Sequence, residues 1–141
     1  MKPLNAIRCF LVDMDGTFYL GDRLLPGALE FAELMRSRGV PFLFLTNNSS
    51  KKNSQYAEKL RRLGLEIDAS QIFTSGEATA IYLKREKPGA RLYVVGTPAL
   101  ESELDAHGFT RTEENPDYVV LGFDTTVTYD KLWKLCDFVR A

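Results

Sequence analysis

Two acidic residues, one residue apart, follow an apolar run near the start of the chain. In CFLVDMDGTFYLGD, residues 9–22, Asp13 and Asp15 come directly after four apolar residues. A strand alternates its side chains between two faces, so residues 13 and 15 would point the same way. Two neighbouring carboxylates repel each other unless a positive charge compensates. Hard oxygen ligands suit Mg²⁺, so this pair indicates a magnesium site.

Polar residues also end a second apolar run. VPFLFLT, residues 40–46, ends in Thr46, and Asn47 and Asn48 follow it. In open α/β sheets, ligands bind at the carboxyl ends of the strands. If the two runs form neighbouring strands, the acids and the amides converge on one crevice. A hydroxyl, amide groups and backbone N–H groups would suit phosphate oxygens there.

Such a crevice would give each acid its own role. Asp13 would attack phosphorus as a carboxylate nucleophile while a metal screens the charges. Asp15 would protonate the leaving oxygen and later deprotonate a water. Gly16 would relieve Cβ crowding at a sharp turn. Simpler interpretations exist: MDGT also suits a hairpin turn, and TNNSS also suits a helix N-cap.

The elements that must position these residues alternate along the chain. Strand-like runs and amphipathic helical segments follow one another with short connections, which predicts a doubly wound parallel α/β sheet. Thr74 and Thr97 are the expected N-caps of two helices, and Thr128 of a third. Strands are expected in IRCFLV (7–12), VPFLFLT (40–46), IFTSGEAT, RLYVVG and DYVVLGF. The first of these reads as a buried central strand, because its apolar residues do not alternate with polar ones.

A shift in composition at KREKPGAR, residues 84–91, marks the one domain boundary that the sequence offers. The elements beyond it would either extend the first sheet or begin a second small α/β domain. Leu132, Leu135, Cys136 and Val139 still follow helical spacing where the sequence ends, and no cap closes that helix. Uncapped carbonyls and an unpartnered apolar face predict the first part of a longer protein.

The composition restricts partners and location. The 141 residues are 45% hydrophobic and carry a net charge of −1, which predicts a globular protein without broad affinity for nucleic acid or anionic membranes. No apolar window is long enough for a membrane span. Cys9 and Cys136 are expected to be buried free thiols, which favours a cytoplasmic location. His107 is expected at the surface, at a helix C-terminus.

The chain resembles the haloacid dehalogenase-like hydrolases. FLVDMDGT and FLFLTNNSS resemble their first and second signatures; YLGDRLLPGA, TSGEAT, YVVG and VVLGFDTTVTYDKL resemble the p-nitrophenylphosphatase-like branch, subfamily IIA, which includes phosphoglycolate phosphatase-like sugar phosphatases. The resemblance implies Mg²⁺-dependent hydrolysis of small phosphomonoesters through an aspartyl-phosphate. The substrate would be a sugar phosphate, a nucleotide or p-nitrophenyl phosphate.

The resemblance also assigns roles by position. Asp13 would be the nucleophile and Asp15 the general acid and base. The carboxylate of Asp13 and the backbone carbonyl of Asp15 would bind Mg²⁺. Thr46, Asn47, Asn48 and Gly16 would form the phosphate-binding set.

Two further family signatures, a lysine and an acidic metal ligand, have no match in the sequence. Residues 1–82 would therefore be the N-terminal part of a catalytic core, and residues 83–141 the first part of an inserted α/β cap domain. The expected partner is a small phosphorylated metabolite, and no binding to nucleic acid or to a membrane is expected. The sequence does not decide whether a homodimer forms through the cap. A catalytically incomplete fragment that binds phosphate and Mg²⁺ is the alternative function, and a receiver-like phosphoacceptor domain is a weaker one.

Overall fold

A computed structural model describes residues 6–140, which divide into two compact units. The first unit contains the chain up to Thr46 together with Asn53–Phe73. The second unit contains Asn47–Lys52 together with the chain from Thr74 onward. The second unit thus begins ahead of the boundary expected between residues 82 and 83. The assignment of a core part and a cap part stays a prediction.

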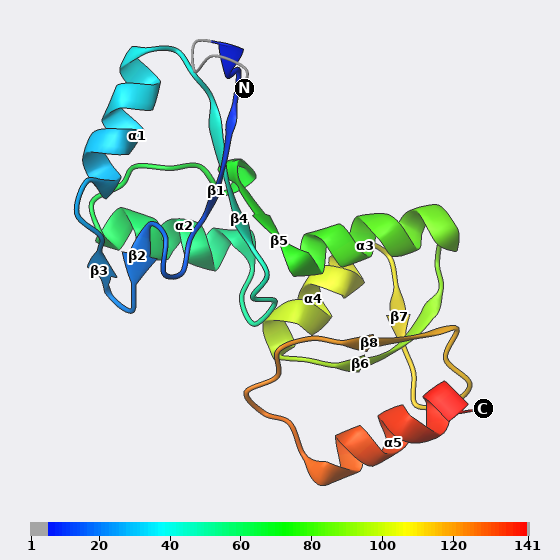
Figure 1. Cartoon of the computed structure of the whole chain (residues 1–141). Helices are drawn as coiled ribbons and strands as arrows, with labels where there is room; N and C mark the ends of the chain where they lie inside the picture. Colours follow the sequence, from blue (N-terminus) through cyan, green and yellow to red (C-terminus); the bar gives the residue numbers. More distant parts are fainter. Residues whose placement is uncertain (1–5, 141) are drawn as a thin grey trace. The chain divides into compact units, whose positions relative to one another are not determined.

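The first unit is built on a three-stranded sheet in the order β1-β4-β5 (Figure 1). β1 (Phe10–Asp13) pairs in parallel with β4 (Phe42–Thr46), and β5 (Ile72–Thr74) lies on the other side of β4. The connections contain the short strands β2 (Tyr19–Leu20) and β3 (Arg23–Leu24), the helices α1 (Ala28–Ser37) and α2 (Asn53–Arg62), and the 3₁₀-helix η2 (Ala69–Gln71). The strand-to-helix alternation and the parallel pairing confirm the predicted α/β class.

One face of this sheet carries the core of the first unit. Phe42 and Phe44 of β4 are buried on it, and Phe10 and Val12 pack against the same cluster. The helices contribute the buried residues of their apolar stripes, namely Ala28, Ala32 and Met35 of α1 with Tyr56, Ala57 and Leu60 of α2. Both stripes agree with the helical spacing of the sequence.

The prediction of a central strand buried on both faces was wrong for β1. The strand begins at Phe10 rather than Ile7, and Leu11 on its second face is 64% exposed. The cause is topological: among the described strands β1 lies at the edge of its sheet, and the buried residues of α1 and α2 join the core on the face that carries Phe42 and Phe44. An uninterrupted apolar run does not distinguish these two situations.

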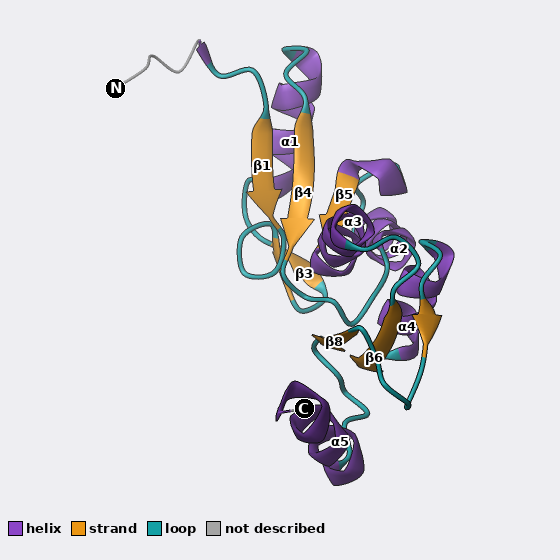
Figure 2. Ribbon diagram, turned by 90° about the vertical axis from the view of Figure 1, so that its right-hand side faces the viewer, coloured by secondary structure: helices purple, strands orange, loops and turns teal. Residues whose placement is uncertain are grey.

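The second unit has a parallel three-stranded sheet in the order β7-β6-β8, of which β6 and β8 are labelled in Figure 2. Its strands are β6 (Arg91–Val95), β7 (Thr110–Arg111) and β8 (Tyr118–Leu121), and its helices are α3 (Ser75–Glu86), α4 (Pro98–Ala106) and α5 (Tyr129–Arg140). The core between α3, α4 and the sheet contains Ala80, Leu83, Leu92, Val94, Leu100, Leu104 and Val120. α5 packs on the sheet through Phe138, whose ring centroid lies 5.0 Å from that of Tyr93.

Leu100 of α4 is packed against two glycines at strand ends. Its side chain is 1% exposed. A Cβ atom added at Gly96, after β6, would lie 2.6 Å from Leu100 Cδ2, and one at Gly122, after β8, would lie 2.5 Å from the same atom. Real Cβ contacts are not this short, so both glycines allow α4 to approach the ends of the strands.

The predicted helix N-caps are present. Thr74 accepts the N–H of Glu77 at the start of α3, and Thr97 accepts the N–H of Leu100 at the start of α4. Thr128 Oγ1 accepts the N–H of Lys131 at 3.3 Å. Each cap satisfies an N–H group that the first helical turn leaves without an intrahelical partner.

The prediction of buried cysteines was wrong, because Cys9 and Cys136 are both exposed. Cys9 precedes β1, and Cys136 lies on α5, of whose described residues none is buried. Apolar spacing identified the helix, but it did not show how little of α5 is covered. His107 caps the C-terminus of α4 and is half-buried. Across residues 6–140, no helix is both long and apolar enough to cross a membrane.

Candidate active site

The carboxyl ends of β1 and β4 lie side by side in the first unit. Asp13, the last residue of β1, is in register with Leu45, and Thr46 is the last residue of β4. Parallel pairing brings these two strand ends to the same edge of the sheet, as the sequence predicted. Thr46 is only 8% exposed, so this residue lies within the packed edge of the sheet.

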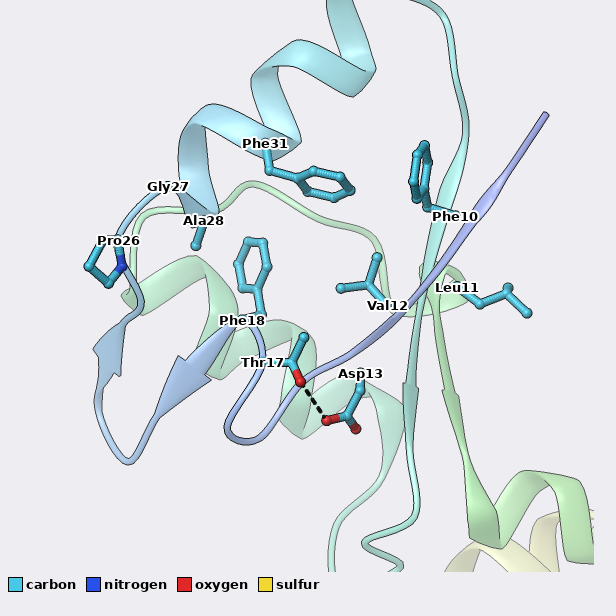
Figure 3. A pocket seen from close by; sticks show the side chains of 10 residues that line it. All are labelled: Phe10, Leu11, Val12, Asp13, Thr17, Phe18, Pro26, Gly27, Ala28 and Phe31. Atoms are coloured by element: carbon cyan, nitrogen blue, oxygen red, sulfur yellow. Dashed lines mark hydrogen bonds between the residues drawn. The ribbon is translucent and has the colours of Figure 1, made fainter. Parts of the chain in front are cut away.

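The two acids flank a fully buried methionine. Met14 is 0% exposed, whereas Asp13 and Asp15 are both exposed. The alternation continues past the end of the strand and makes both carboxylates accessible to a ligand. Thr17 Oγ1 donates a hydrogen bond to Asp13 Oδ2 at 3.0 Å and thereby orients that carboxylate (Figure 3).

A tight turn follows the first acid. The N–H groups of residues 17, 18 and 19 all donate to the carbonyl of Met14, at 3.3, 2.9 and 3.1 Å. Gly16 donates its N–H to the carbonyl of Tyr19 at 2.7 Å and has φ +82°. A Cβ atom at Gly16 would meet nothing within 4 Å, so the left-handed backbone requires the glycine. The expectation that Gly16 relieves crowding was therefore wrong.

MDGT is not the turn of a hairpin that pairs back onto β1. β1 pairs with β4 among the described strands, and the hairpin lies further on, between β2 and β3. In that hairpin Tyr19 pairs with Leu24, and Gly21 has φ +56°. The Asp-Gly step instead closes the turn that carries Asp15.

The charges of both acids affect the pKa of the Tyr19 phenol. Its side chain is 2% exposed, and burial is the main cause that raises the pKa of its phenol to about 12. The charges of Tyr56, Asp15 and Asp13 raise this pKa further, in that order. Both carboxylates therefore act on one buried phenol, and Asp15 also forms an isolated β-bridge with Tyr19.

The two asparagines follow Thr46 directly in the chain, and their contacts belong to the second unit. Ser75 Oγ donates to the backbone carbonyl of Asn47 at 2.9 Å. Asn48 Oδ1 accepts the N–H of Ser50 at 2.9 Å, so this side chain shapes its own loop. α2 begins at Asn53, so TNNSS forms a loop ahead of the helix rather than its N-cap.

Two further residues hold this loop, and the sequence did not single them out for this role. Thr97 Oγ1 donates to the carbonyl of Ser50 at 2.9 Å. Ser49 Oγ accepts the N–H of Phe123 at 2.9 Å, and Ser49 is 7% exposed. Thr97 was recognisable as a helix cap, but its second bond joins residues 47 positions apart, which no local pattern reveals.

An open crevice of about 510 Å³ lies beside Asp13 in the first unit (Figure 3). Asp13 and Thr17 form its polar end. The other lining residues are apolar or glycine, and they are Phe10, Leu11, Val12, Phe18, Pro26, Gly27, Ala28 and Phe31. The accessible carboxylate thus stands at the border between polar and apolar surface.

The oxygen ligands at this edge of the sheet are of the chemical type that a hard cation prefers. The carboxylate of Asp13 and the backbone carbonyl of Asp15 are ligands of the type that Mg²⁺ prefers, and exposure leaves room for the waters that Mg²⁺ retains. Within the described part of the chain, no group of three or more His, Cys, Asp or Glu side chains is able to hold a metal.

The accessible carboxylates lie where open α/β domains bind their ligands, at the carboxyl ends of parallel strands. Residues 10–110 match the family model described as haloacid dehalogenase-like hydrolase, and the chain belongs to this family. The sequence resemblance to these hydrolases is thereby confirmed.

Known relatives come from the NagD-like and p-nitrophenylphosphatase-like part of that family. The 5′-nucleotidase YutF of Bacillus subtilis is 38% identical over 97% of this chain and 54% of its own length. The solved structure of a 4-nitrophenylphosphatase from Thermotoga maritima is 46% identical, with a TM-score of 0.91 over 95% of this chain and 51% of that one. A glycerol phosphate phosphatase from Mycobacterium tuberculosis, solved in complex with magnesium, is 34% identical, with a TM-score of 0.87 over 96% of this chain and 42% of that one. The chain spans about half the length of the curated relatives it matches.

Proposed function

We propose that this chain carries the nucleophile and the general acid of a magnesium-dependent phosphatase that hydrolyses small phosphomonoesters. The observation that carries the proposal is the accessible pair Asp13 and Asp15, the first of which ends β1 next to the end of β4 in a parallel sheet. Family membership supports the reaction class. The relatives named 5′-nucleotidase and 4-nitrophenylphosphatase support a phosphomonoester as the substrate.

The reaction would proceed in two displacements at phosphorus. In the first, a carboxylate oxygen of Asp13 bonds to phosphorus while the bond to the ester oxygen breaks, and Asp15 gives its proton to the departing alkoxide. In the second, Asp15 takes a proton from a water whose oxygen bonds to phosphorus, and the bond to Asp13 breaks. Alcohol and inorganic phosphate leave, and both acids return to their initial states.

Other residues would bind and orient the substrate. The hydroxyl of Thr46 and the amide groups of Asn47 and Asn48 would donate to phosphate oxygens. Gly16 would act through its backbone conformation, because its N–H already bonds Tyr19. Asp13 Oδ and the carbonyl of Asp15 would hold Mg²⁺, whose charge would screen the attacking carboxylate from the phosphate. The magnesium complex of the mycobacterial relative supports this choice of ion.

The wider assignments are proposals of the same kind. Residues 1–82 would belong to a catalytic core and residues 83–141 to the beginning of a cap, in a protein that acts on a phosphorylated metabolite in the cytoplasm. The half-length match to the relatives favours a second candidate, in which this chain alone binds phosphate and Mg²⁺ without turnover. Catalytic groups act as a unit, so absent members would lower the rate by orders of magnitude.

Hydrolysis of p-nitrophenyl phosphate with and without Mg²⁺ tests the proposal. Asp13→Asn should abolish turnover, with a loss of roughly a thousandfold or more, because the amide is not a nucleophile. Asp22→Asn is the matched control, since Asp22 is a 96% exposed acid on the hairpin. Unchanged turnover in Asp13→Asn would refute the mechanism. The second candidate would be supported by a wild type that shows no turnover but binds inorganic phosphate, and binds it only when Mg²⁺ is present.

A further inference from the structure

A lysine of α2 lies over the ring of Tyr19. Lys59 Nζ is 3.9 Å from the ring centroid, and the lysine side chain is only 16% exposed. The same Nζ lies 4.0 Å from Asp22 Oδ1, in the turn between β2 and β3. One ammonium group therefore contacts both the beginning and the turn of the hairpin.

The ring contact is the stronger of the two. Both the ring and the lysine are largely withdrawn from water, and a cation over an aromatic face gains most when it is desolvated. Asp22 is 96% exposed, and exposed ion pairs at this distance contribute little. Removal of the lysine charge should therefore loosen Tyr19 more than removal of the Asp22 charge.

The backbone of Tyr19 is part of the turn that carries the second acid. Its carbonyl accepts the N–H of Gly16 at 2.7 Å, and its N–H donates to Met14 at 3.1 Å. Asp15 and Tyr19 also form an isolated β-bridge. A displacement of the tyrosine would be transmitted through these bonds to the residues on both sides of Asp15.

We propose that Lys59 is a positioning residue, which holds Asp15 in place by fixing the ring of Tyr19 from α2. The role assigned to Asp15 rests on the proposed function. The alternative is that the lysine only fills space with its aliphatic stem, as long basic side chains often do. The two accounts differ in what a neutral side chain of similar length would do at this site.

The exchange rate of the Gly16 amide hydrogen, followed by NMR, separates the two accounts. This hydrogen is bonded to Tyr19, so its exchange reports local opening of the turn. Lys59→Met keeps the stem and removes the charge, and it should speed Gly16 exchange by roughly tenfold. Lys59→Arg keeps a cation for the ring and should restore the slow rate. Amides of β4 should be unchanged in both variants, which separates a local effect from a loss of global stability.

Two control variants complete the experiment. Asp22→Asn removes only the ion pair, and Arg62→Met removes a positive charge from the same helix; both should leave Gly16 exchange as in the wild type. If Lys59→Met leaves the Gly16 rate unchanged, or if Lys59→Arg is as fast as Lys59→Met, the positioning role is refuted. Equal acceleration of the Gly16 and β4 amides would also refute it.

Activity adds a second readout with a separate meaning. With p-nitrophenyl phosphate, Lys59→Met should lower kcat by roughly tenfold with little change in KM, and Lys59→Arg should restore kcat. An inactive wild type whose Gly16 amide responds as expected would count against the proposed function and leave the contact with Tyr19 established. Normal turnover with no response at Gly16 would overturn the role of Lys59 alone.

Discussion

Alkaline pH should destabilise the fold through the phenol of Tyr19. Burial, followed by the charges of Tyr56, Asp15 and Asp13, raises the pKa of this phenol from 10.0 to about 12. The folded protein therefore retains the proton at a pH where the unfolded chain has released it. Between these two pKa values the unfolded state binds fewer protons, so stability falls as the pH rises.

The size of the effect follows from the two pKa values. A tenfold difference in proton affinity corresponds to about 1.4 kcal/mol, so the unfolding free energy should fall by roughly 3 kcal/mol in total. About half of that loss, ~1.4 kcal/mol, should be present near pH 11, midway between the pKa values. Below pH 10 the contribution of Tyr19 should be almost complete.

Urea unfolding of the wild type and Tyr19→Phe, at pH 9 and pH 11, isolates this contribution. Phenylalanine keeps an aromatic ring beneath Lys59, so the substitution removes the phenol hydroxyl and retains the contact between cation and ring. The wild type should lose about 1.4 kcal/mol more than Tyr19→Phe between these two pH values. Asp15→Asn should reduce this gap, because it removes one of the charges that raise the pKa of Tyr19.

Equal pH dependence in the two proteins would refute the reasoning. It would mean that the phenol is as accessible to water in the folded state as in the unfolded chain, or that the acids lie too far away to act on it. The burial of Tyr19 or the effect of Asp13 and Asp15 on its phenol would then be in error. An absorbance titration of tyrosinate in both proteins would give the pKa of Tyr19 by difference.

Three other substitutions have expected outcomes in unfolding experiments. Gly16→Ala should destabilise the fold by about 1–2 kcal/mol, because φ +82° is unfavourable for a residue with a Cβ atom; no loss in urea unfolding would contradict that backbone conformation. Burial, and to a smaller extent the charge of Glu77, raises the pKa of Glu103 in the folded protein. The unfolded chain therefore releases this proton first, and the free energy of unfolding falls as the pH rises through the folded pKa. Glu103→Gln, which keeps an acceptor for Thr74 Oγ1, should be more stable than the wild type at neutral pH, and this advantage should disappear in acid; a constant difference across pH would contradict the expected titration. Thr97→Ala should lose about 1 kcal/mol, because it removes an N-cap together with the donor to Ser50; Thr97→Ser is the control, and thermal melting compares the three proteins.

Features that depend on neighbouring residues were predictable from the sequence. Thr74 and Thr97 cap their helices because a short side chain reaches N–H groups three positions on, and this chemistry is visible in any window of the chain. The two runs that end in Asp13 and Thr46 form parallel neighbours because apolar strands joined by a helix have few other arrangements.

Features that depend on distant contacts were not predictable in the same way. The exposure of Leu11 depends on which strand lies at the edge of the sheet, and strand order is not a property of the run itself. Lys59 has the usual appearance of a solvated helix residue, and only the fold brings it over Tyr19. The loop after Thr46 belongs by contact to the second unit, through bonds such as that of Ser75 to Asn47.

The packing of Leu100 against two glycines makes these three positions dependent on one another during sequence change. Alanine at Gly96 would overlap Leu100 Cδ2, and a shorter residue at position 100 would remove that overlap. Alanine at Gly122 would overlap the same atom and would also lie 2.7 Å from Ser49 Oγ, a contact that shortening residue 100 leaves in place. Paired substitutions at positions 96 and 100 should therefore be non-additive, with alanine at position 96 tolerated only after the leucine has changed, whereas alanine at position 122 would still meet Ser49. Along a mutational route through position 96 the order of the steps matters: shortening residue 100 first allows an alanine that would otherwise overlap the leucine, whereas a route through position 122 requires a change at Ser49 as well.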